Sequence, residues 1–201
     1  RSSDLDSLEK SNKIQENVSG YSNGKVVIRV FENRGRNIVG SFIGFKKALL
    51  NYKYFVHLHT KQSPLAMDGW RKYLLETLLG SPEIVTTILH LLSKNDIGIV
   101  FPQHFSPVLD SVTWGNEYYS IIELMKMSSI NIDLFNMFDF PSGAMFFGKT
   151  QALGKFFDLD FSFGDFPQEY GQTENTLAHA IERSLLYFAE AQGYKWVKII
   201  R

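Results

Sequence analysis

The sequence predicts an α/β fold in which helices flank a mostly parallel β-sheet, as a single domain over residues 1–201. Three observations predict this class. Short apolar segments of strand length alternate with longer segments of helical period. A chain of 201 residues is long enough for one substantial core and short for two. No internal repeat or low-complexity linker divides it. Such alternation favours one layered domain with a parallel sheet.

The first quarter of the chain is expected to form helix, strand, helix and strand. Residues 4–18 are polar with sparse apolar positions, as in a surface helix. Residues 24–31, "GKVVIRVF", are apolar and β-branched and begin at a glycine, which indicates a strand. Residues 38–50 carry apolar side chains at helical spacing. Residues 52–59, "YKYFVHLH", alternate as the next strand.

Helices and strands continue to alternate after this. A helix is expected around 70–78, and Ser81 followed by Pro82 is typical of the start of another that ends near Ser93. Residues 95–102 then indicate a short buried strand. Beyond it we expect a helix over 116–127, a strand over 143–148, a helix over 173–192, and a strand or tail over 194–200.

Composition excludes several function classes. Lys and Arg total 21 and Asp and Glu total 21, so bulk charge attracts neither nucleic acid nor anionic lipid. The chain contains no cysteine, which removes disulfides, thiolate metal sites and thiol nucleophiles. No apolar run approaches the roughly 20 residues that a membrane-spanning helix needs.

Two histidines at the end of residues 52–59 are the first candidate ligands. His57 and His59 point to the same side of a strand. Paired imidazoles there suit a divalent metal or a diphosphate, or else they satisfy neighbouring backbone groups. Lys61 and Ser63 follow directly and suit phosphate, although a solvated turn is an equally simple interpretation.

A basic turn, "ENRGRN", follows the strand expected over residues 24–31. Arg34 and Arg36 have guanidinium groups that match phosphate oxygens, and Gly35 permits a ligand to approach the backbone. Asn37 suits a ligand or a helix cap. Because ligands bind beyond the carboxyl ends of parallel strands, we expect this turn and the histidines at one edge of the sheet. Alternatively, the turn only exposes two arginines.

Two further segments hold candidate residues. Ser142 and Gly143, in "PSGAMFFGK", are small and indicate close approach of a substrate or of another backbone segment. "QTENTLAHAIER" opens the last helix, where Glu174 suits a general base or simply compensates the helix dipole. The polar face of the same helix supplies three candidate substrate-binding residues: His179, Glu182 and Arg183. Alternatively, His179 and Arg183 are surface residues.

Together these segments resemble the rhamnan synthesis protein F family of bacterial polysaccharide assembly. The similarity lies in "ENRGRNI", "YFVHLHTKQSP", "WRKYLLETLLGSPEIV", "IGIVFPQ", "FPSGAMFFGK" and "ENTLAHAIERSL", in this order, from about Lys25 to Leu186. The resemblance implies a glycosyltransferase domain of GT-A-like, Rossmann-like fold. It also implies a domain that lacks its first strand or belongs to a longer chain, because that strand is not evident before Asp4.

The resemblance assigns roles and also shows departures. His57-Leu58-His59 occupies the position of the D-x-D carboxylates that hold a metal in common GT-A transferases. Imidazoles are poorer ligands for Mg²⁺ than carboxylates. The resemblance therefore leaves open whether Mg²⁺ or Mn²⁺ takes part or whether these histidines and Lys61 replace the metal ion. Family members often have Asp-Gly-Thr where this chain has Glu174-Asn175-Thr176, so the carboxylate of the expected base is retained.

The implied function is transfer of a sugar, for which rhamnose is the plain candidate, from a nucleotide-sugar donor such as dTDP-rhamnose. The acceptor would be a glycan or lipid-linked glycan of a cell-surface polysaccharide. We expect a cytoplasmic location, with peripheral association with assembly machinery at the inner face of the membrane, and no nucleic-acid partner. The alternatives are a non-catalytic carbohydrate-binding or assembly module with the same fold, and a histidine-metal hydrolase.

Overall fold

The computed structural model describes residues 2–60, 69–133, 137–172 and 174–200, and the chain divides into two units, 1–33 and 34–201. In the first unit, helix α1 (Ser2–Val18) confirms the first expected helix. The strand expected over residues 24–31 is wrong, because the described part of this unit offers it no partner strand. Val26, Val27 and Val30 are accordingly exposed by 43–53%.

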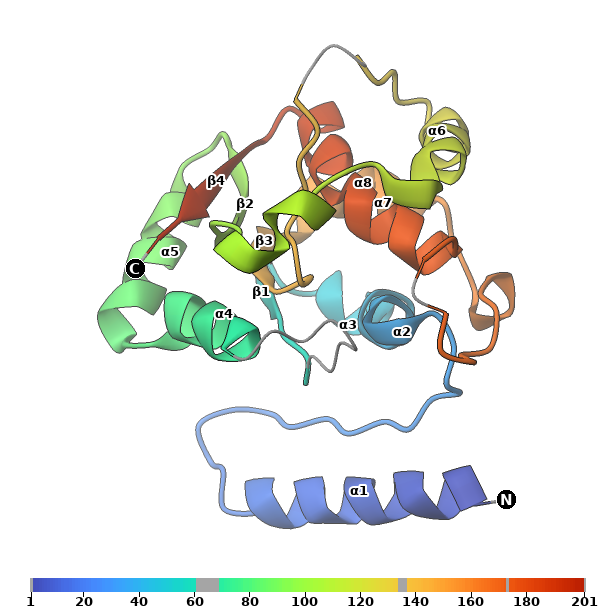
Figure 1. Ribbon diagram of the computed structural model, residues 1–201. Coiled ribbons are helices and arrows are strands. Elements are labelled where there is room, and N and C mark those ends of the chain that lie inside the picture. Colours follow the sequence, from blue (N-terminus) through green and yellow to red (C-terminus); the bar gives the residue numbers. More distant parts are fainter. Residues whose placement is uncertain (1, 61–68, 134–136, 173, 201) are drawn as a thin grey trace. The chain divides into compact units, whose positions relative to one another are not determined.

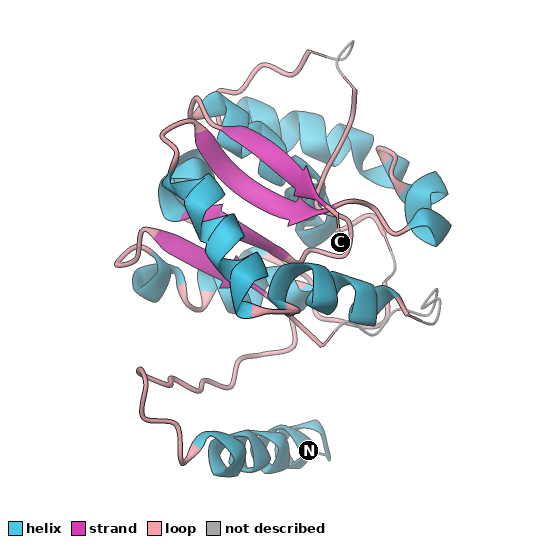
Figure 2. Cartoon of the chain, turned by 90° about the vertical axis from the view of Figure 1, so that its left-hand side faces the viewer, coloured by secondary structure: helices cyan, strands magenta, loops and turns pink. Residues whose placement is uncertain are grey.

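The second unit contains a four-stranded mixed sheet (Figure 2). Its strands are β1 (Tyr54–His57), β2 (Ile97–Pro102), β3 (Phe146–Lys149) and β4 (Lys195–Ile199), in the order β1-β3-β2-β4. Strand β3 is antiparallel to both neighbours, and only β2 and β4 are parallel. The prediction of a mostly parallel sheet is therefore wrong. The alternation of helices and strands along the sequence does not determine in which direction each strand runs through the sheet.

The antiparallel strand β3 determines what gathers at one edge of the sheet. His57 pairs with Phe146, and Val100 pairs with Phe147. The amino end of β3 therefore lies beside the carboxyl ends of β1 and β2. As a result, the turn that precedes β3 meets the histidines at the carboxyl ends of the other two strands.

Helices cover both faces of the sheet (Figures 1 and 2). One face packs against helices α4 and α5, and the other packs against α7 and α8. The α-helices of this unit are α2 (Arg36–Ile38), α3 (Lys46–Leu49), α4 (Trp70–Leu79), α5 (Pro82–Ser93), α6 (Tyr118–Met127), α7 (Gly154–Asp158) and α8 (Leu177–Ala191). A π-helix, η1 (Val39–Ile43), joins α2 to the segment before α3, and 3-10 turns lie at 106–111, 115–117, 150–153 and 163–165.

Most expected elements of this unit are confirmed. Ser81 caps α5 by accepting a hydrogen bond from the Ile84 amide at 3.4 Å. The helix expected over 38–50 is divided into α2, η1 and α3, and residues 194–200 contain the final strand rather than a tail. In the part of the chain that the structure describes, no helix has the length and apolar character needed to cross a membrane.

Candidate functional site

Three histidines from two strand ends hold one turn, residues 142–144. His57 Nδ1 lies 2.5 Å from the Ala144 carbonyl oxygen, and His59 Nε2 lies 2.7 Å from that of Gly143. His104 Nδ1 lies 2.9 Å from Ser142 Oγ. Because a carbonyl oxygen only accepts, His57 and His59 donate to the turn. These contacts are of the kind in which the two histidines satisfy neighbouring backbone groups, one of the two interpretations that the sequence left open.

The chemistry of His57 follows from its burial, since its side chain is only 4% exposed. Burial, followed by the charge of neighbouring His59, lowers the pKa of His57 to about 4. The ring is neutral near pH 7, with its proton on Nδ1, so Nε2 accepts from the Ser41 hydroxyl at 3.0 Å. Both ring nitrogens are thus engaged, and His57 does not fit a metal site in this arrangement. The described residues include no group of three or more His, Asp or Glu side chains that could hold a metal.

The small residues of the 142–144 turn fit tightly against α4. Gly143 has a φ of +84°, and a Cβ there would lie 2.8 Å from Leu74 Cδ1 and 3.2 Å from the Trp70 ring. Ser142 is only 6% exposed. The close approach that the sequence predicts is therefore made by side chains of α4 and by the histidines.

A chain of polar contacts through Lys198, Asp139 and His104 ends at Ser142. His104 Nε2 lies 2.9 Å from Asp139 Oδ1, and Lys198 Nζ lies 2.5 Å from Asp139 Oδ2. Burial alone would raise the pKa of Asp139, but the bonds from His104 and Lys198 outweigh it and hold that pKa below its ordinary value. The ionised carboxylate fixes the imidazole that orients the Ser142 hydroxyl.

The basic turn lies on the other side of His57. Arg34 Nη1 donates to the Phe166 carbonyl at 2.9 Å, which ties this arginine to the protein. Gly35 has a φ of +58°, and a Cβ would lie 2.0 Å from Val39 Cγ2 and 2.9 Å from the Phe166 ring. Gly35 is therefore required by packing, whatever ligand approaches. The backbone of Asn37 lies against the His57 ring.

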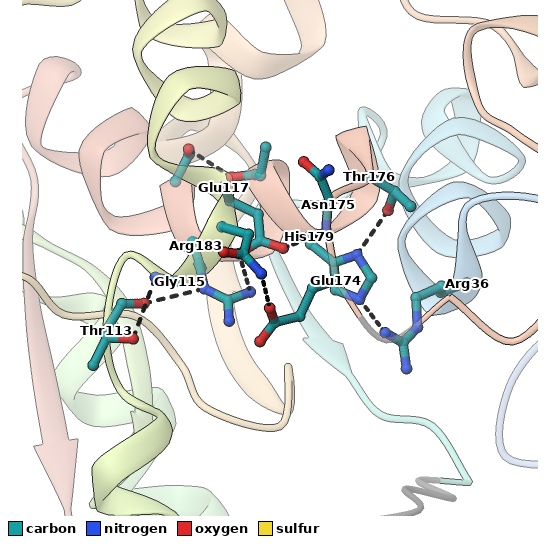
Figure 3. Close-up of polar contacts among 12 residues, drawn as sticks. Arg36, Thr113, Gly115, Glu117, Glu174, Asn175, Thr176, His179 and Arg183 are labelled. Atoms are coloured by element: carbon teal, nitrogen blue, oxygen red, sulfur yellow. Dashed lines mark hydrogen bonds and ion pairs between the residues drawn. The ribbon is translucent and has the colours of Figure 1, made fainter.

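Arg36 turns instead toward helix α8 (Figure 3). Its guanidinium contacts His179 Nε2, and its amide donates to Glu169 Oε1 at 3.1 Å. Because a guanidinium only donates, Nε2 of His179 accepts, and Nδ1 carries the proton toward Thr176 Oγ1 at 2.8 Å. His179 is 3% exposed, so this neutral imidazole is part of the core rather than a surface residue.

Glu174 lies in the turn before α8, with its side chain exposed. Asn116 Nδ2 donates to its Oε2 at 2.7 Å. The next residue, Asn175, has a φ of +65°, in the left-handed region that favours glycine. Its amide donates to Glu117 Oε1 at 2.6 Å, and this bond holds the turn that carries Glu174.

Glu117 is a site residue that the sequence did not reveal. Its side chain is fully buried, and its Oε2 lies 3.6 Å from Nη1 of Arg183 (Figure 3). Arg183 also donates from Nε to the Thr113 carbonyl at 3.2 Å and lies 5.2 Å from the Phe140 ring. Glu117 follows a glycine-asparagine pair that indicated only the start of a helix, so no spacing rule linked it to α8.

The structure brings most of the candidate residues to one region around α2. Arg36 contacts α8, and the backbone of the next residue, Asn37, lies against His57. His57 in turn is hydrogen-bonded to the 142–144 turn. Glu182 lies on α8 and is half-buried. Lys61 and Ser63 fall outside the described residues. Arg36 contacts α8 through His179, and the exposed carboxylate Glu174 lies in the turn that precedes α8.

The fold is that of a mixed α/β protein, and comparison with known proteins gives the family. The family model of rhamnan synthesis protein F matches residues 4–194, and the chain belongs to this family. The resemblance noted in the sequence is thereby confirmed.

Two curated relatives are similar to the chain, and both are called "Uncharacterized protein WxcX", from two strains of Xanthomonas campestris pv. campestris. Each is 36% identical over 159 residues, which cover 76% of this chain and 22% of the relative. The chain thus spans about a fifth of the length of these relatives. No solved structure matches it significantly.

Proposed function

We propose that this chain is the catalytic domain of a nucleotide-sugar-dependent glycosyltransferase of GT-A-like type, which extends a cell-surface polysaccharide. The family is linked to rhamnan synthesis, which makes rhamnose from dTDP-rhamnose the plain candidate for the transferred sugar. The observation that carries the proposal is the exposed Glu174 carboxylate. Asn116 donates a hydrogen bond to it, and buried Glu117 accepts a hydrogen bond from the Asn175 amide in the same turn.

In this proposal Glu174 is the general base. One of its carboxylate oxygens takes the proton of an acceptor hydroxyl, and the hydroxyl oxygen forms a bond to the anomeric carbon of the donor. The bond between that carbon and the diphosphate oxygen breaks, and the diphosphate leaves with the electron pair. A positioned base of this kind contributes about 10²–10⁴-fold to a rate.

Arg36 is the proposed cation for the leaving diphosphate. Arg34 is less suited, because its guanidinium already donates to the Phe166 carbonyl. The Arg36 guanidinium has several donors, of which one faces His179, and its side chain is exposed. Fixed positive charge at a developing anion is a large term in catalysis of this type.

A non-catalytic carbohydrate-binding module is the second candidate. The observation that favours it is the pair His57 and His59, which stands where carboxylates are expected and is bonded to the 142–144 turn. Such a module would bind glycan and would have no need of nucleotide.

Calorimetric titration with dTDP and UDP separates the two functions. The transferase proposal expects one nucleotide to bind, and expects Arg36→Gln to weaken its binding at least tenfold. Lys126→Gln is the matched control, because Lys126 is an exposed cation on α6 away from this region. Failure of both nucleotides to bind, with glycan still bound, would support the module instead.

A further inference from the structure

A hollow between α8 and β4 is a second place where the structure can hold a ligand. It has a volume of about 210 Å³ and is lined by side chains of three segments. The lining residues are Met137, Asp139, Leu186, Tyr187, Glu190 and Trp196. Pockets for drug-sized ligands measure roughly 300–1,000 Å³, so this one fits a single ring rather than a nucleotide sugar.

The hollow combines aromatic rings with hydrogen-bonding groups in fixed positions. The Trp196 indole donates to Glu190 Oε1 at 2.8 Å, which fixes the indole against α8. The Tyr187 ring stacks on Trp114 with a centroid distance of 6.0 Å. Burial, and then the Glu190 and Asp139 carboxylates, raise the pKa of Tyr187 to about 12, so its hydroxyl remains a hydrogen-bond donor.

The hollow offers carboxylates as hydrogen-bond acceptors. Asp139 and Glu190 both line it, and Lys198 Nζ, 2.5 Å from Asp139 Oδ2, balances the charge of Asp139, so the Glu190 carboxylate is the group that would repel a phosphate. Carboxylate oxygens accept hydrogen bonds from hydroxyl groups, while the C–H face of a sugar ring packs on an indole or phenol ring. The combination therefore matches a neutral, polyhydroxylated ring.

Helix α8 connects the hollow to the proposed catalytic site. His179, Arg183 and Tyr187 are spaced by four residues and share one helix face. At 1.5 Å per residue, His179 and Tyr187 lie about 12 Å apart along the axis. Phe140 provides a second link, because it contacts Arg183 and follows Asp139 in sequence.

We propose that this hollow binds one sugar residue of the glycan acceptor, set back along α8 from the residue that receives the transferred sugar. The assignment of the glycan as an acceptor rests on the proposed transferase function, whereas binding of the sugar itself does not. The ligand class is a neutral pyranose within an oligosaccharide.

The test is saturation-transfer NMR with methyl α-L-rhamnoside and methyl α-D-glucoside, without donor. We expect ring-proton signals from at least one glycoside, and expect them to fall at least fivefold in Tyr187→Phe, which removes only a hydroxyl, and in Glu190→Gln. Glu123→Gln, an exposed acid on α6, is the matched control and should retain the signals.

Competition with nucleotide distinguishes this site from the catalytic one. Excess dTDP and UDP should leave the glycoside signals unchanged. Absence of any signal, or signals that neither variant reduces, would overturn the sugar site, and displacement by nucleotide would place the sugar elsewhere. Each of these results leaves the calorimetric test of nucleotide binding intact, so failure here is separable from failure of the transferase proposal.

Discussion

Neutralising Glu117 should destabilise the protein. In Glu117→Gln the side chain keeps its shape and an oxygen that can accept from the Asn175 amide, but it loses its charge. Arg183, which is 9% exposed, then keeps its charge without the buried carboxylate that lies 3.6 Å from it. The perturbation therefore isolates the charge of a buried pair.

The structure allows the size of this effect to be worked out. Removing one partner of a buried ion pair costs about 3–5 kcal/mol, because the other charge is left uncompensated. The Thr113 carbonyl and the Phe140 ring still contact Arg183, so we expect the lower end, about 3 kcal/mol. For a chain of this size, that corresponds to a fall in Tm of about 6–12 °C. Removing both charges in Glu117→Gln/Arg183→Met should restore more than half of the loss, since no unpaired charge remains.

Urea unfolding at pH 7 followed by circular dichroism measures these free energies of unfolding. Glu123→Gln, on the exposed face of α6, serves as the control and should change stability by less than about 0.5 kcal/mol. A loss below about 1 kcal/mol in Glu117→Gln would refute the reasoning. So would a double variant whose loss equals the sum of the two single losses.

Two further predictions concern stability. The pKa of His57 is about 4 in the folded protein and 6.5 as a free side chain, so the unfolded state binds a proton more readily between these values. Stability should therefore fall as the pH drops from about 6.5 to about 4, by about 3 kcal/mol for this group. Urea unfolding across this pH range measures how the free energy of unfolding depends on pH. The part of that dependence due to His57 should disappear in His57→Gln, and an unchanged dependence would contradict the lowered pKa of His57. Gly35→Ala should destabilise the protein by more than about 2 kcal/mol, because its Cβ meets Val39 at 2.0 Å in addition to backbone strain. Gly193 also has a positive φ but has open space around it, so Gly193→Ala should cost only the backbone strain of about 1–2 kcal/mol. Equal losses of stability at both glycines would refute the steric argument.

The sequence predicted the elements of the second unit well because their signals are local. The Ser81-Pro82 start of α5 appears as expected, and α8 lies within the helix expected over 173–192. The relative direction of the strands was predicted wrongly, because the direction of β3 depends on the path of the long connection before it. The strand expected over residues 24–31 failed because β-branched composition cannot supply a partner strand.

The candidate site was predicted only in part. Sequence placed His57, His59 and the 142–144 turn among the candidates, but it could not show that the histidines donate to that turn, since the contact depends on the antiparallel direction of β3. His179 and Arg183 were as consistent with a surface as with a site, and burial of both became evident only from the packing of α8. Buried Glu117 carried no sequence signal, because its partners lie 58 and 66 residues further along the chain.

The central claim is that the Glu174 carboxylate takes the proton of an acceptor hydroxyl, and transfer by Glu174→Gln tests it most directly. The assay follows labelled rhamnose from dTDP-rhamnose to a lipid-linked glycan in membrane extract, with Glu123→Gln as control. The amide can still accept from Asn116, so the fold and nucleotide binding should persist. Transfer should fall by about 10²–10⁴-fold while the control keeps its full rate. Glu174→Gln transfer at the unmodified rate would contradict the account.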